Sequence, residues 1–151
     1  MNVRNVKPED VNVFIRLYAT SYRGLEKYAY TNKRDIRRYF YWLLSRDPGG
    51  FFIVELNEPV GFIACDTNWF SRFEGEVLGE IHELFVHPKY RGRGIGRTLV
   101  NKAVEYAKSR GRRIAGLWVG VKNFHARKFY RKMGFVETIS TGIWIRMIKK
   151  I

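Results

Sequence analysis

Residues 84–97 read LFVHPKYRGRGIGR, and this stretch decides the fold. It continues an apolar segment predicted to be a strand at 77–86, and it leads into a predicted helix from about Ile95 to Arg110. The alternating glycines between them let a backbone approach a ligand with no side chains in the way. Because the turn opens into a helix, free amide groups and the positive end of the helix dipole face whatever lies there. The turn therefore has the properties of a cradle for a pyrophosphate group.

The glycines do not have the spacing of two common phosphate-binding motifs. A Walker A loop has four residues between its glycines and then Lys-Ser/Thr, but three residues separate Gly92 from Gly96. A dinucleotide-binding turn has two residues between its second and third glycines, and here there is one. A glycine-rich connection without a ligand is the alternative, although Arg91, Arg93 and Arg97 would then repel one another with no anion between them.

Net charge separates the two parts of the sequence. The chain of 151 residues has 28 Lys/Arg and 14 Asp/Glu residues, a net of +14. Residues 1–83 hold 11 basic and 12 acidic residues, a net of −1, whereas residues 84–151 hold 17 basic and two acidic residues, a net of +15. We therefore expect the second part to meet an anion, which could be nucleic acid, a membrane surface or a phosphorylated cofactor. A basic surface without a specific partner is the alternative.

Composition favours a globular protein with one domain over residues 1–151. Hydrophobic residues make up 46% and charged residues 28%, which excludes an intrinsically disordered chain. No apolar run approaches the roughly 18 residues of a membrane span, and residues 1–10 carry charges where a signal peptide would be apolar. Cys65 is the one thiol, so no internal disulfide and no cysteine metal cluster is expected. We expect a cytoplasmic protein without membrane association.

Periodicity and turn residues predict the remaining elements. One helix is predicted after Pro8 and a second from Asn32 to Arg46, while a short helix opens at Asn123 and stops at Gly134. Strands are predicted at 2–7, 51–54, 60–65, 77–86, 114–119, 135–139 and 143–149. The order is βααβββαβαββ, and the strand–turn–helix–strand unit at 77–119 predicts a parallel strand pair with a right-handed crossover. The fold class is therefore α/β with a mixed sheet.

Two motifs carry a resemblance to a known family. Residues 91–96, RGRGIG, match the pattern Arg/Gln-x-x-Gly-x-Gly/Ala, and residues 123–135, NFHARKFYRKMGF, match a second motif with Asn, Ala and Phe-Tyr-x-x-x-Gly-Phe. The chain thus resembles the GNAT superfamily of acetyl-CoA-dependent N-acyltransferases over nearly its whole length. The resemblance is weakest at 20–50, where the family varies with its acceptor. It implies a twisted mixed sheet of about seven strands, helices on both faces, and splayed central parallel strands.

The resemblance implies where acetyl-CoA would bind. The pyrophosphate would lie on the amides of the glycine turn, and the pantetheine arm would run between the splayed strands. The amide of Val86 would face the thioester carbonyl, where it could stabilise developing negative charge. The implied contacts are Leu84, Phe85, Val86, Arg91, Gly92, Arg93, Gly94, Ile95, Gly96, Arg97, Asn123 and Tyr130.

The chemistry of amine acetylation requires two proton transfers. An amine is a nucleophile only when neutral, so its proton must be taken, and the leaving thiolate must gain one. Tyr130 matches the tyrosine near the cofactor sulfur and is the expected general acid; a core tyrosine on an amphipathic helix is the alternative. For the base we rank Glu80 first, Glu83 second and His82 third, and a family member without a dedicated base stays open. In a regular strand Glu80 and His82 share a face and Glu83 points away, unless a bulge intervenes.

Local composition offers two indications about the acceptor. Residues 66–83 contain five acids and one arginine, which favours a cationic amine such as a polyamine, a basic peptide or an amino sugar. Aromatic residues at 28–30, 39–42 and 69–70 could line an acceptor pocket, although burial in the core explains at least half of them. His87 and His125 lack companions at metal-ligand spacing, so no metal is expected.

The sequence therefore predicts an N-acetyltransferase that moves an acetyl group from acetyl-CoA to a primary amine by direct attack in a ternary complex. No Cys or Ser lies within the motifs, so a covalent acyl-enzyme is not expected. Exposed final strands often mediate dimers in the family, so the resemblance allows a homodimer. One alternative is a basic nucleic-acid-binding protein, which the position of the basic residues on a cofactor-type turn disfavours. The other is a non-catalytic acetyl-CoA-binding domain.

Overall fold

The computed structural model describes residues 1–151 and has the predicted order of elements. The helices are α1 (Val11–Ser21), α2 (Lys33–Arg46), α3 (Ile95–Ser109) and α4 (Phe124–Lys132). The strands are β1 (Asn2–Asn5), β2 (Phe51–Glu55), β3 (Pro59–Ser71), β4 (Glu76–Val86), β5 (Ile114–Gly120), β6 (Val136–Thr141) and β7 (Trp144–Lys150). Short 3₁₀ turns lie at Pro8–Asp10, Glu26–Tyr28, Pro48–Gly50 and Pro88–Tyr90. No helix has the length and apolar character that crossing a membrane requires.

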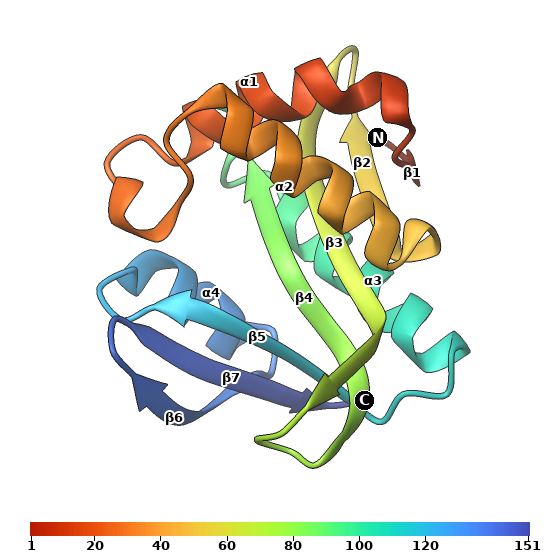
Figure 1. Cartoon of the computed structure of the whole chain (residues 1–151), viewed down its shortest axis with the longest axis vertical. Coiled ribbons are helices and arrows are strands. Elements are labelled where there is room, and N and C mark those ends of the chain that lie inside the picture. Colours follow the sequence, from red (N-terminus) through yellow and green to blue (C-terminus); the bar gives the residue numbers. More distant parts are fainter.

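The seven strands form one mixed sheet in the order β1-β2-β3-β4-β5-β7-β6. The central pair, β4 and β5, is parallel, and every other neighbouring pair is antiparallel. Only Gly79 with Ala115 and Glu80 with Gly116 are paired between β4 and β5. Beyond these residues the two strands diverge, as Figure 1 shows. The splayed parallel strands that the resemblance implied are therefore present.

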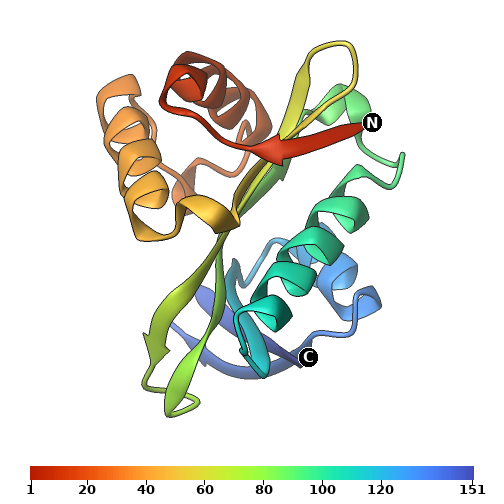
Figure 2. The same cartoon turned by 90° about the vertical axis from the view of Figure 1, so that its right-hand side faces the viewer.

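Helices cover both faces of the sheet, as predicted. Helices α1 and α2 lie on one face and α3 and α4 on the other (Figure 2). The first face has a core rich in phenylalanine, in which Phe14 lies within 5.1–6.0 Å of the rings of Phe40, Phe51, Phe62 and Phe85. The second face buries aliphatic residues of α3, including Leu99 and Val100. Burial of these side chains supplies the main driving force that holds the helices to the sheet.

The hairpin of β3 and β4 is longer than predicted. The sequence predicted a strand at 60–65, but β3 continues to Ser71 and pairs with β4 down to Glu76. An irregularity in register between Asp66 and Trp69 accompanies the extension. Asp47 stabilises it, because its buried carboxylate accepts hydrogen bonds from the amide and the hydroxyl of Thr67 at 2.8 and 2.6 Å. These contacts come from a loop 20 residues away, which strand periodicity does not reveal.

Candidate active site

A cavity of about 1110 Å³ lies where β4 and β5 separate. Its walls come from the ends of β4 and β5, the glycine turn, α4 and the connection between α1 and α2. Eleven of the predicted cofactor contacts line it: Leu84, Phe85, Val86, Arg91, Gly92, Gly94, Ile95, Gly96, Arg97, Asn123 and Tyr130. Arg93 does not line it and instead lies over the ring of Tyr90, 5.2 Å from its centroid. The fold thus gathers two motifs that are far apart in the sequence.

The glycine turn leaves the start of α3 open. Gly92 and Gly94 have φ values of +78° and +79°, which side chains other than glycine's rarely allow. Gly94 is the N-cap of α3, and no side chain caps the first amides of the helix. These amides therefore remain available to an anion.

The arginine at the start of the turn has a bracing role. Arg91 donates from Nε to the carbonyl of Val86 at 3.2 Å and from its terminal nitrogen to the carbonyl of Ser21 at 3.1 Å. It therefore joins the end of β4 to the end of α1. Lys128 and Lys132, one helical turn apart on α4, line the cavity with Arg97 and add positive charge there. Sequence reasoning missed these two lysines, although they belong to the motif at 123–135.

A bulge at His82 turns Glu83 into the cavity. Ala64 is paired with Glu83, but the next β3 residue, Cys65, is paired with Ile81, so His82 is an extra residue in β4. Residues 81 and 83 would share a face in a regular strand. Here Ile81 packs in the α3-side core and Glu83 faces the α1–α2 side. The bulge therefore reverses the expected orientation of Glu83.

Glu83 is a buried carboxyl group held by two phenols. Tyr22 of the α1–α2 connection donates its hydroxyl to Oε2, and Tyr39 of α2 donates to Oε1 at 2.9 Å. Burial raises the pKa of Glu83 to about 7, because removal from water disfavours the charged form and the two hydrogen bonds only partly offset this. At neutral pH the group is therefore poised to gain or lose a proton.

Tyr130 lies in the same cavity and keeps its proton. The side chain is buried on α4, packs in the α3-side core and lines the cavity. Burial, and then the nearby charge of Glu83, raise the pKa of Tyr130 above its ordinary value. Tyr130 is therefore a core residue and also part of the cavity wall.

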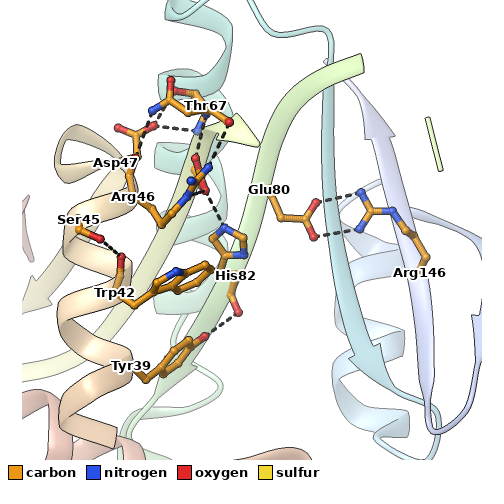
Figure 3. A network of polar contacts seen from close by, with 11 residues as sticks. Tyr39, Trp42, Ser45, Arg46, Asp47, Thr67, Glu80, His82 and Arg146 are labelled. Atoms are coloured by element: carbon orange, nitrogen blue, oxygen red, sulfur yellow. Dashed lines mark hydrogen bonds and ion pairs between the residues drawn. The ribbon is translucent and has the colours of Figure 1, made fainter. Parts of the chain in front are cut away.

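Glu80 lies outside the main cavity in a buried ion pair. Both of its carboxylate oxygens accept hydrogen bonds from Arg146 of β7 at 2.9 Å (Figure 3). The same guanidinium contacts Glu74 at 2.8 Å. Gly116 leaves room for this pair, since a Cβ there would lie 2.4 Å from Arg146. The first-ranked candidate base is therefore engaged by a cation.

His82 is also held by neighbours. Its Nε2 lies 2.9 Å from Asp66, and its ring lies 4.9 Å from the ring of Trp42 (Figure 3). The ring of Trp69 lies 4.8 Å from the imidazole. Asp66 in turn accepts a hydrogen bond from Arg46 at 2.7 Å. The imidazole therefore closes a side wall of the cavity and is fixed in orientation.

Comparisons with known proteins agree with this geometry. The model of the acetyltransferase (GNAT) family matches residues 13–135. The chain belongs to the GNAT family of acetyltransferases. It is 57% identical over 143 residues to an uncharacterized N-acetyltransferase of Archaeoglobus fulgidus, covering 94% of this chain and 97% of that protein. It is 53% identical over 150 residues to an uncharacterized N-acetyltransferase of Methanocaldococcus jannaschii, covering 99% of this chain and 66% of that protein.

Solved structures show the same fold. A crystal structure from Pyrococcus horikoshii OT3 has a TM-score of 0.90 and 36% identity, covering 99% of this chain and 98% of that chain. The PaiA N-acetyltransferase of Thermoplasma acidophilum, in complex with coenzyme A, has a TM-score of 0.79 and 22% identity. The match covers 99% of this chain and 98% of that chain. The second likeness supports the fold alone, because its identity is low.

The acids at 66–83 of this acetyltransferase are nearly all neutralised by partners. Arg46 pairs with Asp66, Arg146 with Glu74 and Glu80, and Arg113 with Glu76. The negative surface that the sequence suggested for the acceptor side is therefore largely absent. Of these acids only Glu83, which has phenols as partners, lines the main cavity.

Aromatic rings form much of the cavity wall of the acetyltransferase. Tyr28, Tyr30 and Tyr39 line the cavity as predicted, whereas Phe40 belongs to the core and Trp69 and Phe70 lie outside the cavity. Sequence reasoning missed several other rings of the cavity, among them Tyr18, Tyr22, Trp118 and Trp144. The pairing of β5 with β7 brings the two tryptophans to the cavity. The sequence of each strand alone does not reveal which strands pair.

Proposed function

We propose that this acetyltransferase transfers the acetyl group of acetyl-CoA directly to a neutral primary amine, with Glu83 as general base and Tyr130 as general acid. The proposal is carried by one observation: a carboxyl group with a pKa of about 7 lies in the same cavity as a protonated tyrosine, beside the open glycine turn. A group whose pKa is near the working pH is best suited to general base catalysis.

The residues present fit the parts of acetyl-CoA. The amides at the start of α3, with Arg97, Lys128 and Lys132 nearby, suit its phosphates. The edge of β4 beyond Glu80 has no partner strand, so its main-chain groups are free to pair with the amides of a pantetheine arm. Asn123 accepts a hydrogen bond from the Ala126 amide at 3.3 Å, which leaves its side-chain NH₂ group for the arm.

The Val86 amide is oriented toward this free edge. The next residue, His87, donates its amide to Val60 of β3 at 2.8 Å. Alternate residues of an antiparallel strand direct their main-chain groups to opposite sides. The Val86 N–H therefore points to the side that β5 has left, where it would donate to the thioester oxygen as negative charge develops.

The proposed step balances protons and bonds. The amine nitrogen attacks the thioester carbonyl carbon, a C–N bond forms and the C–S bond breaks. The Glu83 carboxylate takes the proton from nitrogen, and the Tyr130 hydroxyl gives a proton to the leaving sulfur. Tyr22 and Tyr39 hold Glu83 in place throughout. The acceptor class stays open among polyamines, amino sugars and peptide amines, and ring faces suit the cationic forms of all three.

Binding of acetyl-CoA is tested by calorimetry with a matched pair of variants. Gly94 and Gly75 both have positive φ and open space at the Cβ position, but only Gly94 lines the cavity. Asparagine tolerates this conformation. We expect one-to-one binding that Gly94→Asn weakens at least tenfold and that Gly75→Asn leaves unchanged.

A DNA duplex titrated at two salt concentrations, and a panel of amines assayed for CoA release, complete the test. Absence of acetyl-CoA binding together with tight, salt-sensitive DNA binding would overturn the proposal, since phosphate contacts weaken steeply with salt. Acetyl-CoA binding without turnover of any amine would identify a non-catalytic domain.

A further inference from the structure

Tyr28 joins the two sides of the cavity. It lies on the connection between α1 and α2, and its hydroxyl accepts a hydrogen bond from the amide of Lys122, just beyond β5, at 3.0 Å. Its ring lies 5.4 Å from the ring of Trp144 on β7. Residues that are 94 positions apart in the chain are thus held together across the mouth of the splayed strands.

Gly120 makes space for this ring. A Cβ on Gly120 would lie 2.4–2.6 Å from three carbon atoms of the Tyr28 ring. The φ of Gly120 is not positive, so this glycine is not required by backbone conformation. The last residue of β5 is therefore adapted to the tyrosine that covers it.

The covered region borders a second cavity of about 370 Å³. This cavity is lined by Glu80, Ile81, His82, Trp118, Thr141 and Trp144. Four of these residues, Ile81, His82, Trp118 and Trp144, also line the main cavity, so the two spaces adjoin at the indole rings and the imidazole. Tyr28 lines the main cavity and does not line the second one.

We propose that Tyr28 is a specificity-determining residue for the acceptor. With its hydroxyl on the Lys122 amide and its ring against Gly120 and Trp144, it narrows the main cavity at the end of β5 and keeps wide acceptors out of it there. The acceptor then approaches Glu83 through the second cavity, between Trp118, Trp144 and His82. Such a slot takes an amine on a slender, unbranched chain and rejects one on a wide ring. This inference rests on the proposed acetyl transfer.

The hydrogen bond between the Tyr28 hydroxyl and the Lys122 amide, here called the latch, can be tested without any acceptor. The measurement is hydrogen exchange of the Lys122 amide. Tyr28→Phe removes the acceptor oxygen, and Gly120→Ala forces the ring away, so both substitutions are expected to speed exchange at Lys122 at least tenfold. Tyr30→Phe is the matched control, because Tyr30 lies on the same connection with a more exposed ring. Unchanged protection in both test variants would overturn the latch.

Specificity is tested with hexylamine and cyclohexylamine, which have equal carbon number but different width at the amine. We expect the wild-type enzyme to prefer hexylamine, and Tyr28→Ala to raise the ratio of cyclohexylamine to hexylamine kcat/KM by about tenfold. A ratio that does not respond to Tyr28→Ala would overturn the assignment of specificity. Release of CoA with neither amine nor any other would instead overturn the proposed function and this assignment with it, while the exchange measurement would still report on the latch.

Discussion

Glu80 and Glu83 are three residues apart on the same strand and are almost equally buried, with 3% and 7% of their surface exposed. Both oxygens of Glu80 accept hydrogen bonds from the guanidinium of Arg146, whereas the side-chain partners of Glu83 are the neutral hydroxyls of Tyr22 and Tyr39. A cation compensates the cost of burying a carboxylate, and neutral donors compensate it in part. Burial therefore makes one group a structural ion pair and gives the other a pKa of about 7.

The difference arises from the point at which the sheet divides. At Glu80, β4 is still paired with β5, so β7 is near enough for Arg146 to reach across. Three residues later β5 has diverged, and the bulge at His82 directs Glu83 toward the tyrosines. Strand geometry, more than residue type, thus separates an acid held in an ion pair from the acid proposed as the base.

The largest expected effect contrasts Glu83→Gln with Glu80→Gln. Loss of the base is expected to lower kcat/KM about 10²- to 10⁴-fold at pH 8, the usual range for a positioned general base. Glu80→Gln leaves Arg146 paired with Glu74 and should stay within about tenfold of wild type. Steady-state CoA release measures both. If the Glu83→Gln enzyme were active and the Glu80→Gln enzyme inactive, Glu80 would be the general base instead of Glu83.

A second substitution tests the structural side of the comparison. Arg146→Met leaves Glu74 and Glu80 buried without a counter-ion, so the free energy of unfolding is expected to fall by about 3–5 kcal/mol at pH 7. Arg113→Met is the control, since its pair with Glu76 is 79% exposed on the arginine side and such pairs contribute at most about 1 kcal/mol. Urea unfolding followed by circular dichroism compares the two. If both variants lost the same free energy of unfolding, the buried ion pair would contribute no more to stability than the exposed one.

Local signals explain why part of this structure was predictable. The glycine turn, the helix that opens at Asn123 and the order of elements depend on residues close in sequence, and all were predicted. The ranking of Glu80 above Glu83 left open a bulge that would change which side chains share a face. Sequence alone could not place that bulge at His82, and it could not show the approach of Arg146, which lies 66 residues from Glu80. The pairing of Tyr28 with Gly120 is likewise a long-range contact without a sequence pattern.

The smallest expected effect concerns the pH at which Glu83 becomes active. As a base, Glu83 must be ionised, so kcat/KM calculated for the neutral form of the amine should rise with pH through about 7 and then level off. Tyr39 donates a hydrogen bond that stabilises the carboxylate and lowers the pKa of Glu83, so Tyr39→Phe should raise that pKa. A hydrogen bond to a charged group contributes about 1.5–3 kcal/mol, which corresponds to an upward shift of about one pH unit or more, while the plateau is largely kept. Tyr41→Phe, an exposed neighbour on α2, should leave the inflection in place. If Tyr39→Phe leaves the inflection in place or moves it to lower pH, the rate does not follow ionisation of Glu83. Glu80 and Glu83 would then differ in structure alone.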